Sequence, residues 1–166
     1  DFSITTGTLE SSPEGDKYVL NGEIVTSDFI APTEVESYLE ARIDKKKTII
    51  SWDHASGLIH RFSIAELSRT DKNRELILVW DGTASGAKQK GSKTVNIPVS
   101  GDFSVLDVKT RTGENPGIDI IFSDPVDESQ ELEGLIYFDP MTPVTTSVNT
   151  NIVTLVLTEA LRQEAT

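Results

Sequence analysis

The chain has 166 residues, of which 27 are acidic and 15 are basic, and its formal net charge is -12. So strong a negative charge repels a phosphate backbone, which excludes nucleic acid as a partner. The absence of cysteine excludes a disulfide scaffold and any cysteine-ligated metal, and no run of about 18 apolar residues suggests a membrane span or membrane contact.

The first part of the chain predicts two strands. β-branched residues fill residues 2–9, and a turn cluster ends this segment. Within residues 17–27 the dipeptide Asn21-Gly22 is typical of a hairpin turn, but the related residues 117–123 continue without a turn. We therefore predict one long strand that allows a bulge at Gly22.

The middle of the chain predicts a helical turn and five further strands. Thr33 is the candidate N-cap of the helical turn, because acidic residues follow it. Residues 65–69 are too short for a stable helix and predict a corner turn, and the glycine-containing residues 83–92 predict a loop. The five strands are predicted at residues 39–43, 48–52, 58–64, 75–80 and 93–99.

Alternation along these strands predicts which side chains form the core. In residues 58–64 the side chains of Leu58, His60, Phe62 and Ile64 share one face of the strand. Inward faces of neighbouring strands meet in the interior of a β-sandwich. The predicted core of this part of the chain consists of Ile24, Phe62, Ile64, Leu76, Leu78 and Trp80.

The second part of the chain repeats the first. Residues 1–4 return as 102–105, 23–28 as 119–124, 35–39 as 132–136, and 62–66 as 155–159. The offsets of 101, 96, 97 and 93 drift by a few residues, as expected where loops change length and strands do not. We therefore predict two domains, residues 1–101 and a truncated second copy, residues 102–166.

Short strands separated by turns, without a long amphipathic helix, indicate an all-β fold. We predict two tandem antiparallel immunoglobulin-like β-sandwiches, with seven strands in residues 1–101. Residues 102–166 contain no counterpart of residues 74–101. The second sandwich is therefore expected to be incomplete at its C-terminus, with about five strands and an open sheet edge that favours strand pairing.

The phrase Ile121-Phe122-Ser123-Asp124-Pro125-Val126-Asp127, followed by residues 130–136, resembles the N-terminal region of bacterial alpha-2-macroglobulin-like proteins. Residues 51–54, 60–64, 75–82 and 96–98 are similar to the domain just before it in large members of that family. A strand followed by Phe-Ser-Asp-Pro and an acidic turn also resembles immunoglobulin-like repeats of bacterial surface-layer and adhesin proteins.

The first resemblance implies a non-catalytic N-terminal scaffold segment of a protease inhibitor. Such proteins trap proteases with a cleavable bait segment and, in many members, a Cys-Gln thioester, which a sequence without cysteine does not contain. The resemblance implies a periplasmic or cell-surface location, with a lipid anchor on the parent chain. The implied partners are other domains of that chain and, through the whole protein, target proteases. The alternative is a pair of immunoglobulin-like modules of a bacterial surface adhesin or carbohydrate-binding protein.

The two histidines are the first candidates for chemistry. His54 and His60 lie near Asp53 and Ser56 in the sequence, and these residue types form nucleophile and base pairs or, without the serine, zinc sites. Strand and turn residues so close in sequence rarely reach the geometry of a catalytic triad, and a third firm zinc ligand is not evident. The simpler interpretation is a core histidine at position 60 and a loop histidine at position 54.

Three other groups of residues have similarly simple interpretations. Oxygen ligands for calcium are offered by Asp124, Asp127, Glu128 and Asp139, but their spacing follows no calcium-loop motif. A stacking surface for a sugar is offered by Trp52, Trp80 and Tyr38, although such tryptophans more often cover a core. Residues 82–91 are glycine-rich but precede no helix, and so predict a hairpin loop and no phosphate site. We predict no catalytic residue, no cofactor and no metal, and a protein that is not an enzyme.

Overall fold

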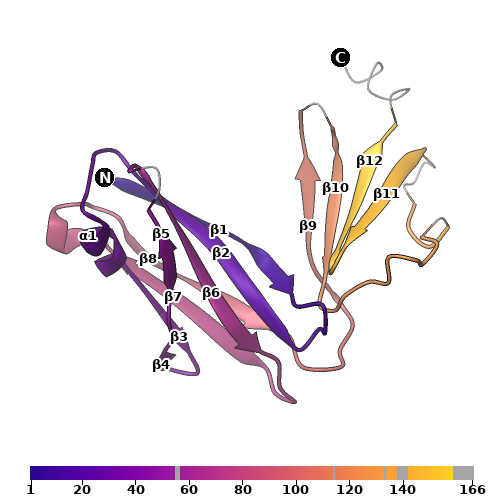
Figure 1. The fold of residues 1–166 in the computed structure, drawn as a ribbon, viewed down its shortest axis with the longest axis horizontal. Helices are drawn as coiled ribbons and strands as arrows, with labels where there is room; N and C mark the ends of the chain where they lie inside the picture. The colour runs from indigo at the N-terminus through magenta and orange to yellow at the C-terminus, as the bar shows by residue number, and fades with distance from the viewer. Residues whose placement is uncertain (55–56, 114, 133, 138–141, 159–166) are drawn as a thin grey trace. The chain divides into compact units, whose positions relative to one another are not determined.

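The computed structural model describes residues 1–54, 57–113, 115–132, 134–137 and 142–158. The chain divides into two compact units, which are described separately. Unit 1 comprises residues 1–10 and 16–101, and unit 2 comprises residues 11–15 and 102–166. The described strands form three four-stranded antiparallel sheets (Figure 1). The prediction of an all-β fold is confirmed.

The first sheet of unit 1 has the strand order β1-β2-β6-β5. Its strands are β1 (Phe2–Ser11), β2 (Lys17–Thr26), β5 (Ser51–Asp53) and β6 (Ile59–Ser68). The β2 strand confirms the prediction of one strand that passes through Asn21-Gly22. Its apolar residues Tyr18, Leu20 and Ile24 are fully buried, because side chains two or four residues apart lie on the same face of a strand.

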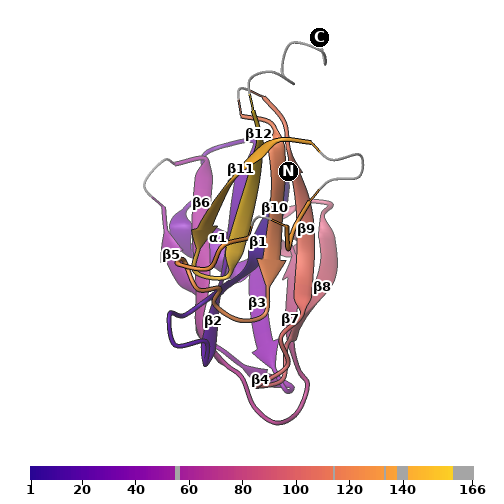
Figure 2. The same cartoon turned by 90° about the vertical axis from the view of Figure 1, so that its right-hand side faces the viewer.

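The second sheet of unit 1 has the strand order β4-β3-β7-β8. Its strands are β3 (Leu39–Ile43), β4 (Lys46–Lys47), β7 (Arg74–Asp81) and β8 (Lys90–Ile97). Helix α1 (Pro32–Ser37) connects the two sheets, and the short 3-10 helix η1 (Thr83–Ser85) lies between β7 and β8. Figure 2 shows the same elements after a quarter turn. The described part of unit 1 therefore has eight strands, one more than predicted.

The core of unit 1 is formed by the apolar faces of these two sheets. Five of the six predicted core residues are at most 2% exposed, namely Ile24, Phe62, Ile64, Leu76 and Leu78. The prediction for Trp80 is wrong, because this side chain is only half-buried. Its indole lies instead against Gly91 of the neighbouring strand, where a Cβ atom would come 2.7 Å from Trp80 Cζ2. Leu58, predicted to face inward, is also partly exposed.

In the β2–β6 ladder the irregularity lies on β6 and not at Gly22, so this ladder does not show the bulge predicted at Gly22. The register shift places Ala65 and Glu66 opposite the single residue Val19 of β2. Glu66 has φ 59°, and an extra residue of this kind bends a strand without ending it. The strand β6 therefore continues to Ser68, and the prediction of a corner turn at residues 65–69 is also wrong.

Glycine at position 22 leaves room for the packing of a neighbouring aromatic ring. A Cβ atom on Gly22 would come 2.3 Å from Cζ of Phe62 and 2.6 Å from the carbonyl oxygen of Thr5. Phe62 faces Gly22 across the β2–β6 ladder, and its ring occupies the space that a larger residue would fill. Glycine in the Asn21-Gly22 pair thus allows the Phe62 ring to approach the backbone closely. The interpretation of this pair as a hairpin turn does not predict such a contact.

Local differences occur at α1 and β5. Helix α1 begins at Pro32 with Ala31 as its N-cap, so the prediction of Thr33 as N-cap is wrong. Proline at the first helical position has a φ suited to the helix and no N–H to leave unpaired. The strand predicted at residues 48–52 is shifted, because β5 spans Ser51–Asp53.

Two connections of unit 1 are short. Asp44 and Lys45 have φ values of 50° and 70° and form the turn between β3 and β4. The second loop, predicted at residues 83–92, ends earlier because β8 begins at Lys90.

Unit 2 has one four-stranded sheet in its described part, with the order β11-β12-β10-β9. Its strands are β9 (Val105–Arg111), β10 (Gly117–Phe122), β11 (Val144–Asn149) and β12 (Ile152–Leu157). The described residues thus contain four strands, where about five were expected. Val153 and Leu155 are buried and face Ile120 and Ile118 across the ladder, so this sheet too has an apolar face.

The aligned residues of the two copies occupy equivalent places in the two sheets. Strands β9, β10, β12 and β11 take the places of β1, β2, β6 and β5 in the strand order. Gly22 faces Phe62 in unit 1, and the aligned Ile118 faces Leu155 in unit 2. Likewise the pair Ile24 and His60 matches the pair Ile120 and Val153. The repeat in the sequence is therefore a repeat of strand register.

Candidate functional site

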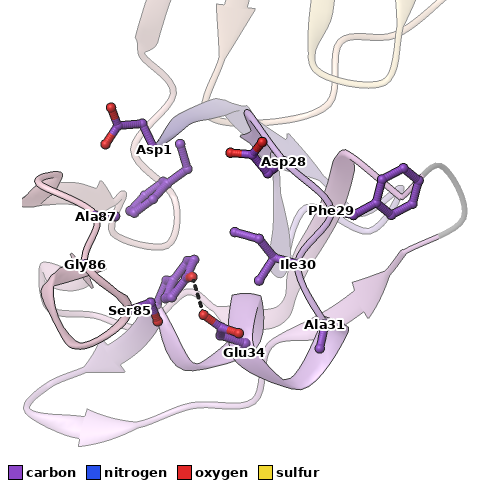
Figure 3. Close-up of a pocket in the computed structure, with 11 residues that line it drawn as sticks. Asp1, Asp28, Phe29, Ile30, Ala31, Glu34, Ser85, Gly86 and Ala87 are labelled. Atoms are coloured by element: carbon purple, nitrogen blue, oxygen red, sulfur yellow. Dashed lines mark hydrogen bonds between the residues drawn. The ribbon is translucent and has the colours of Figure 1, made fainter.

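A pocket of about 350 Å³ lies in unit 1, where the start of β1, the β2–α1 connection, helix α1 and the β7–β8 loop meet. In Figure 3 the side chain of Ile30 points into the pocket, whereas Phe29 is directed away from it. The residues that line it are Asp1, Phe2, Asp28, Phe29, Ile30, Ala31, Glu34, Tyr38, Ser85, Gly86 and Ala87. Of these, only Tyr38 was a candidate binding residue in the sequence analysis.

Three carboxylates give the pocket its polar character, and hydroxyl groups hold two of them. Asp28 Oδ2 lies 2.8 Å from Ser27 Oγ, which also lies 3.1 Å from the carbonyl oxygen of Asp1. Glu34 Oε1 accepts a 3.0 Å hydrogen bond from Tyr38 Oη (Figure 3). The lining residues, all of them described, include no Lys, Arg or His side chain.

Tyr38 connects the pocket to the core. Its ring stacks on Phe2, with ring centroids 5.1 Å apart, and both rings are buried. Burial raises the pKa of Tyr38 because the phenolate would lose its hydration; the hydroxyl of Ser85 opposes this rise and the carboxylate of Glu34 adds to it. Tyr38 therefore stays a neutral hydrogen-bond donor.

The carboxylates of the pocket offer hydrogen-bond acceptance, beside the hydroxyl groups of Tyr38 and Ser85. Carboxylates can accept from hydroxyl or cationic groups, but among these lining residues no base stands beside a nucleophile. Sequence reasoning missed the pocket because its residues come from four separate segments. The one available signal was the pair Ser27-Asp28, which returns as Ser123-Asp124.

That repeated pair has a structural role in both units. Ser123 Oγ lies 2.7 Å from the carbonyl oxygen of Asp102 and 2.7 Å from Asp124 Oδ2. Ser27 contacts the carbonyl of Asp1 and the carboxylate of Asp28 in the same way. Ser123 is fully buried. We call this arrangement the serine clamp; in each unit it ties a residue that precedes the first strand to the end of the second strand.

The histidines belong to a different part of unit 1. His54 Nδ1 lies 2.8 Å from His60 Nδ1, and His54 Nε2 lies 3.1 Å from Glu36 Oε1. His60 is buried at 1% exposure, and its Nε2 atom has no hydrogen-bond partner. Burial lowers the pKa of His60, and the neighbouring His54 lowers it further. The interpretation of His60 as a core residue agrees with this burial.

The catalytic and zinc hypotheses for the histidines also involved Ser56 and Asp53. Ser56 lies outside the described residues, and Asp53 pairs with Arg61 across the β5–β6 ladder. Within the described part of the chain, no three His, Cys, Asp or Glu side chains gather in a way that would hold a metal ion.

The calcium candidates show ordinary loop contacts. Asp127 Oδ1 accepts hydrogen bonds from the N–H and the hydroxyl of Ser129, and the hydroxyl contact is the main cause of the lowered pKa of Asp127. Asp124 belongs to the serine clamp, and Glu128 is exposed. Asp139 lies outside the described residues.

The aromatic candidates lie on different sheets. Trp52, in β5, stacks on His54 with centroids 5.5 Å apart and packs beside Phe62, whereas Trp80 is in β7 of the second sheet. Tyr38 is stacked on Phe2 in the interior. The glycine-rich residues 82–91 contain η1 and the start of β8.

Searches against protein-family profiles, curated proteins and solved structures found no significant match for the chain. In the described part of the chain, no helix has the length and apolar character that crossing a membrane requires.

Proposed function

We propose that the chain is a non-catalytic structural segment of a larger modular protein, and that this protein is a bacterial alpha-2-macroglobulin-like protease inhibitor. The observation that carries the proposal is the repeated architecture. The sheet of unit 2 has the strand order and the register of the first sheet of unit 1, and both units have the serine clamp. A sheet framework that is repeated in tandem is suited to spacing and docking.

The polar groups of the chain support a structural role. Function in a fold resides in particular sites, yet Asp28 and Asp124 hold the serine clamp, and His60 lies in the core of unit 1. The family part of the proposal rests on the resemblance of residues 121–127 and 130–136. On this proposal the partners are other domains of the parent chain and, through the whole protein, target proteases. The location is the periplasm or the cell surface.

The reading frame that encodes the parent protein tests the proposal first. We expect a long chain with further sandwich domains and a bait segment, and a Cys-Gln thioester would identify the family directly. The purified parent should then shield a trapped protease from large protein substrates while small peptide substrates are still cleaved. The 166-residue chain alone should leave the same proteases unaffected. A parent that consists only of further copies of this unit would contradict the inhibitor assignment.

The pocket of unit 1 favours a second candidate, a ligand-binding module of a bacterial surface adhesin or carbohydrate-binding protein. Its carboxylates can accept hydrogen bonds from sugar hydroxyl groups. A glycan array with the full chain tests this function, with Glu34→Gln as the pocket variant and Glu66→Gln as a control, because Glu66 is paired with Lys17 outside the pocket. Binding that Glu34→Gln weakens and Glu66→Gln leaves unchanged would support it, and no binding would remove it.

A further inference from the structure

The outer edge of β9 in unit 2 has features of an interaction surface. β9 is the last strand of its sheet, and no described strand pairs with its outer side. Nearly all of its residues are exposed. Unpaired backbone groups along an exposed edge can accept another strand. The question is which strand this edge is suited to bind.

The hydrogen-bond pattern shows which groups of β9 face outward. The N–H of Phe122 donates to Asn151 on the β12 side of β10. Because these directions alternate along a strand, the N–H groups of Ile121 and Asp119 point to β9, and Ile120 and Val108 form a pair without ladder bonds. The N–H and carbonyl groups of Val108 therefore point away from the sheet.

The Val108 N–H confirms this orientation. It donates a 2.9 Å hydrogen bond to Oδ1 of the preceding Asp107. An outward donor held only by an adjacent flexible side chain is available to a stronger partner, such as a backbone carbonyl of an added strand. The Val108 side chain is 56% exposed, and Val105 and Phe103 near the start of β9 are exposed to a similar degree. An added strand would thus cover apolar surface as well.

The charges of β9 select its partner. In an antiparallel pair of two β9 strands centred on Val108, each Asp107 lies opposite Lys109 of the other strand. Because the N–H and carbonyl groups of Val108 point outward, the two Val108 residues form a hydrogen-bonded pair at the centre. The two pairs of Asp107 with Lys109 then fall at the adjacent non-hydrogen-bonded positions, where side chains lie closer together. We propose that β9 is a self-association edge, through which unit 2 binds a second copy of this chain in an antiparallel, two-fold arrangement.

The other long edge strands lack this combination. β8 presents Lys90 and Lys93, and two such strands centred between these lysines would bring like charges together. β11 has no charged residue, so no charge pair selects a register. On β1 the hydroxyl of Thr6 accepts a hydrogen bond from Lys93 of the neighbouring edge. Self-complementary charge and exposed apolar side chains thus coincide at β9.

Sedimentation equilibrium of the full chain, at about 5 to 500 µM protein, tests the proposal in the affinity range expected for one added strand. We expect a concentration-dependent dimer for the wild type. Asp107→Lys and Lys109→Asp should each be monomeric, because equal charges then meet across the pair. A mixture of these two variants should dimerise again, because one strand then presents two lysines and the other two aspartates. Thermal melts and circular dichroism should show that both variants are folded.

Two further variants locate the interface. Val108→Pro removes an outward N–H without removing a β9–β10 ladder bond and should abolish the dimer. Lys93→Asp changes the charge of the β8 edge instead and should leave the dimer intact. A wild type that is monomeric throughout would overturn the proposal. So would a dimer that survives Val108→Pro or Asp107→Lys, and so would a mixture of the two charge variants that stays monomeric.

Discussion

His60 is a buried polar residue at a position where the second copy has valine. His54 Nε2 faces the carboxylate of Glu36, so a neutral His54 donates there and accepts at Nδ1. His60 must then donate from Nδ1, which leaves its Nε2 as an unpartnered acceptor in the core. The equivalent Val153 leaves no such group unsatisfied. Unit 1 therefore includes a titratable group that unit 2 lacks at this position.

The pH dependence of stability should follow from His60. Its pKa in the folded chain is lowered, below a value of about 6.5 for an unfolded histidine. Between these two values the unfolded chain binds more protons, so neutral His60 has its full stabilising effect above about pH 6.5 and loses it as the pH falls. Below that pH the loss is at most about 1.4 kcal/mol for each pH unit.

His60→Val should make the stability of unit 1 less dependent on pH. Urea unfolding at about pH 5 to 8, followed by tryptophan fluorescence, measures the change. The free energy of unfolding should fall less toward acid pH in the variant than in the wild type. His54→Gln serves as a control, because it keeps the buried His60 and should retain most of the dependence. Parallel pH curves for wild type and His60→Val would contradict this account.

For individual residues, the sequence predicted which side chains are buried better than it predicted the pocket. Alternation along residues 58–64 placed His60, Phe62 and Ile64 on the inner face, and all three are buried. Burial follows a local period that one strand displays by itself. The pocket depends on Asp1, Asp28 and Glu34, which approach one another only after the sheets have formed.

The turn between β3 and β4 contains two residues in a strained backbone conformation. Asp44 and Lys45 both adopt positive φ, as the tight turn of a two-residue hairpin requires. A non-glycine residue is disfavoured there by about 1–2 kcal/mol because its Cβ crowds the following carbonyl. Asp44 also pairs with Arg74 at 2.8 Å, whereas Lys45 is exposed.

Lys45→Gly should therefore stabilise unit 1. The relief of strain exceeds the added entropy of the unfolded chain, and a net gain of about 0.5–1 kcal/mol is expected. Differential scanning calorimetry measures it. Lys47→Gly is the matched control, since Lys47 lies in the ladder of β4 and pairs with Glu40, and it should destabilise. A lower melting temperature for Lys45→Gly would contradict the strain argument.

Strands were predicted well and their irregularities were not. Residues 17–27 were correctly predicted to continue as one strand through Asn21-Gly22. The prediction was possible because the aligned residues 117–123 of the second copy contain no turn signal. The bulge at Ala65 and Glu66 had no such signal, because a glutamate with positive φ is set by the register of two strands. The turn at Lys45 escaped prediction for the same reason. Sequence patterns show which residues are inside, whereas strand pairing decides where the chain must bend.

The two units should respond separately to changes in their cores. Phe62 and Leu155 occupy equivalent ladder positions, and both are buried. Phe62→Ala should cost unit 1 about 3–5 kcal/mol, and Leu155→Ala should cost unit 2 about 2–5 kcal/mol. Because each unit is compact in itself, each substitution should lower only one of two calorimetric transitions. A single transition that both variants lower equally would show that the units unfold together.

The serine clamp has a mechanical consequence. In unit 2 the hydroxyl of Ser123 contacts the carbonyl of Asp102, the first residue after Gly101. A pulling force transmitted along the chain from unit 1 therefore acts on this hydrogen bond before it reaches β9. Ser27 holds Asp1 at the matching point of unit 1. Each unit thus has its own clamp near the start of its first strand. Single-molecule extension should show Ser123→Ala lowering the rupture force of unit 2 while that of unit 1 stays unchanged.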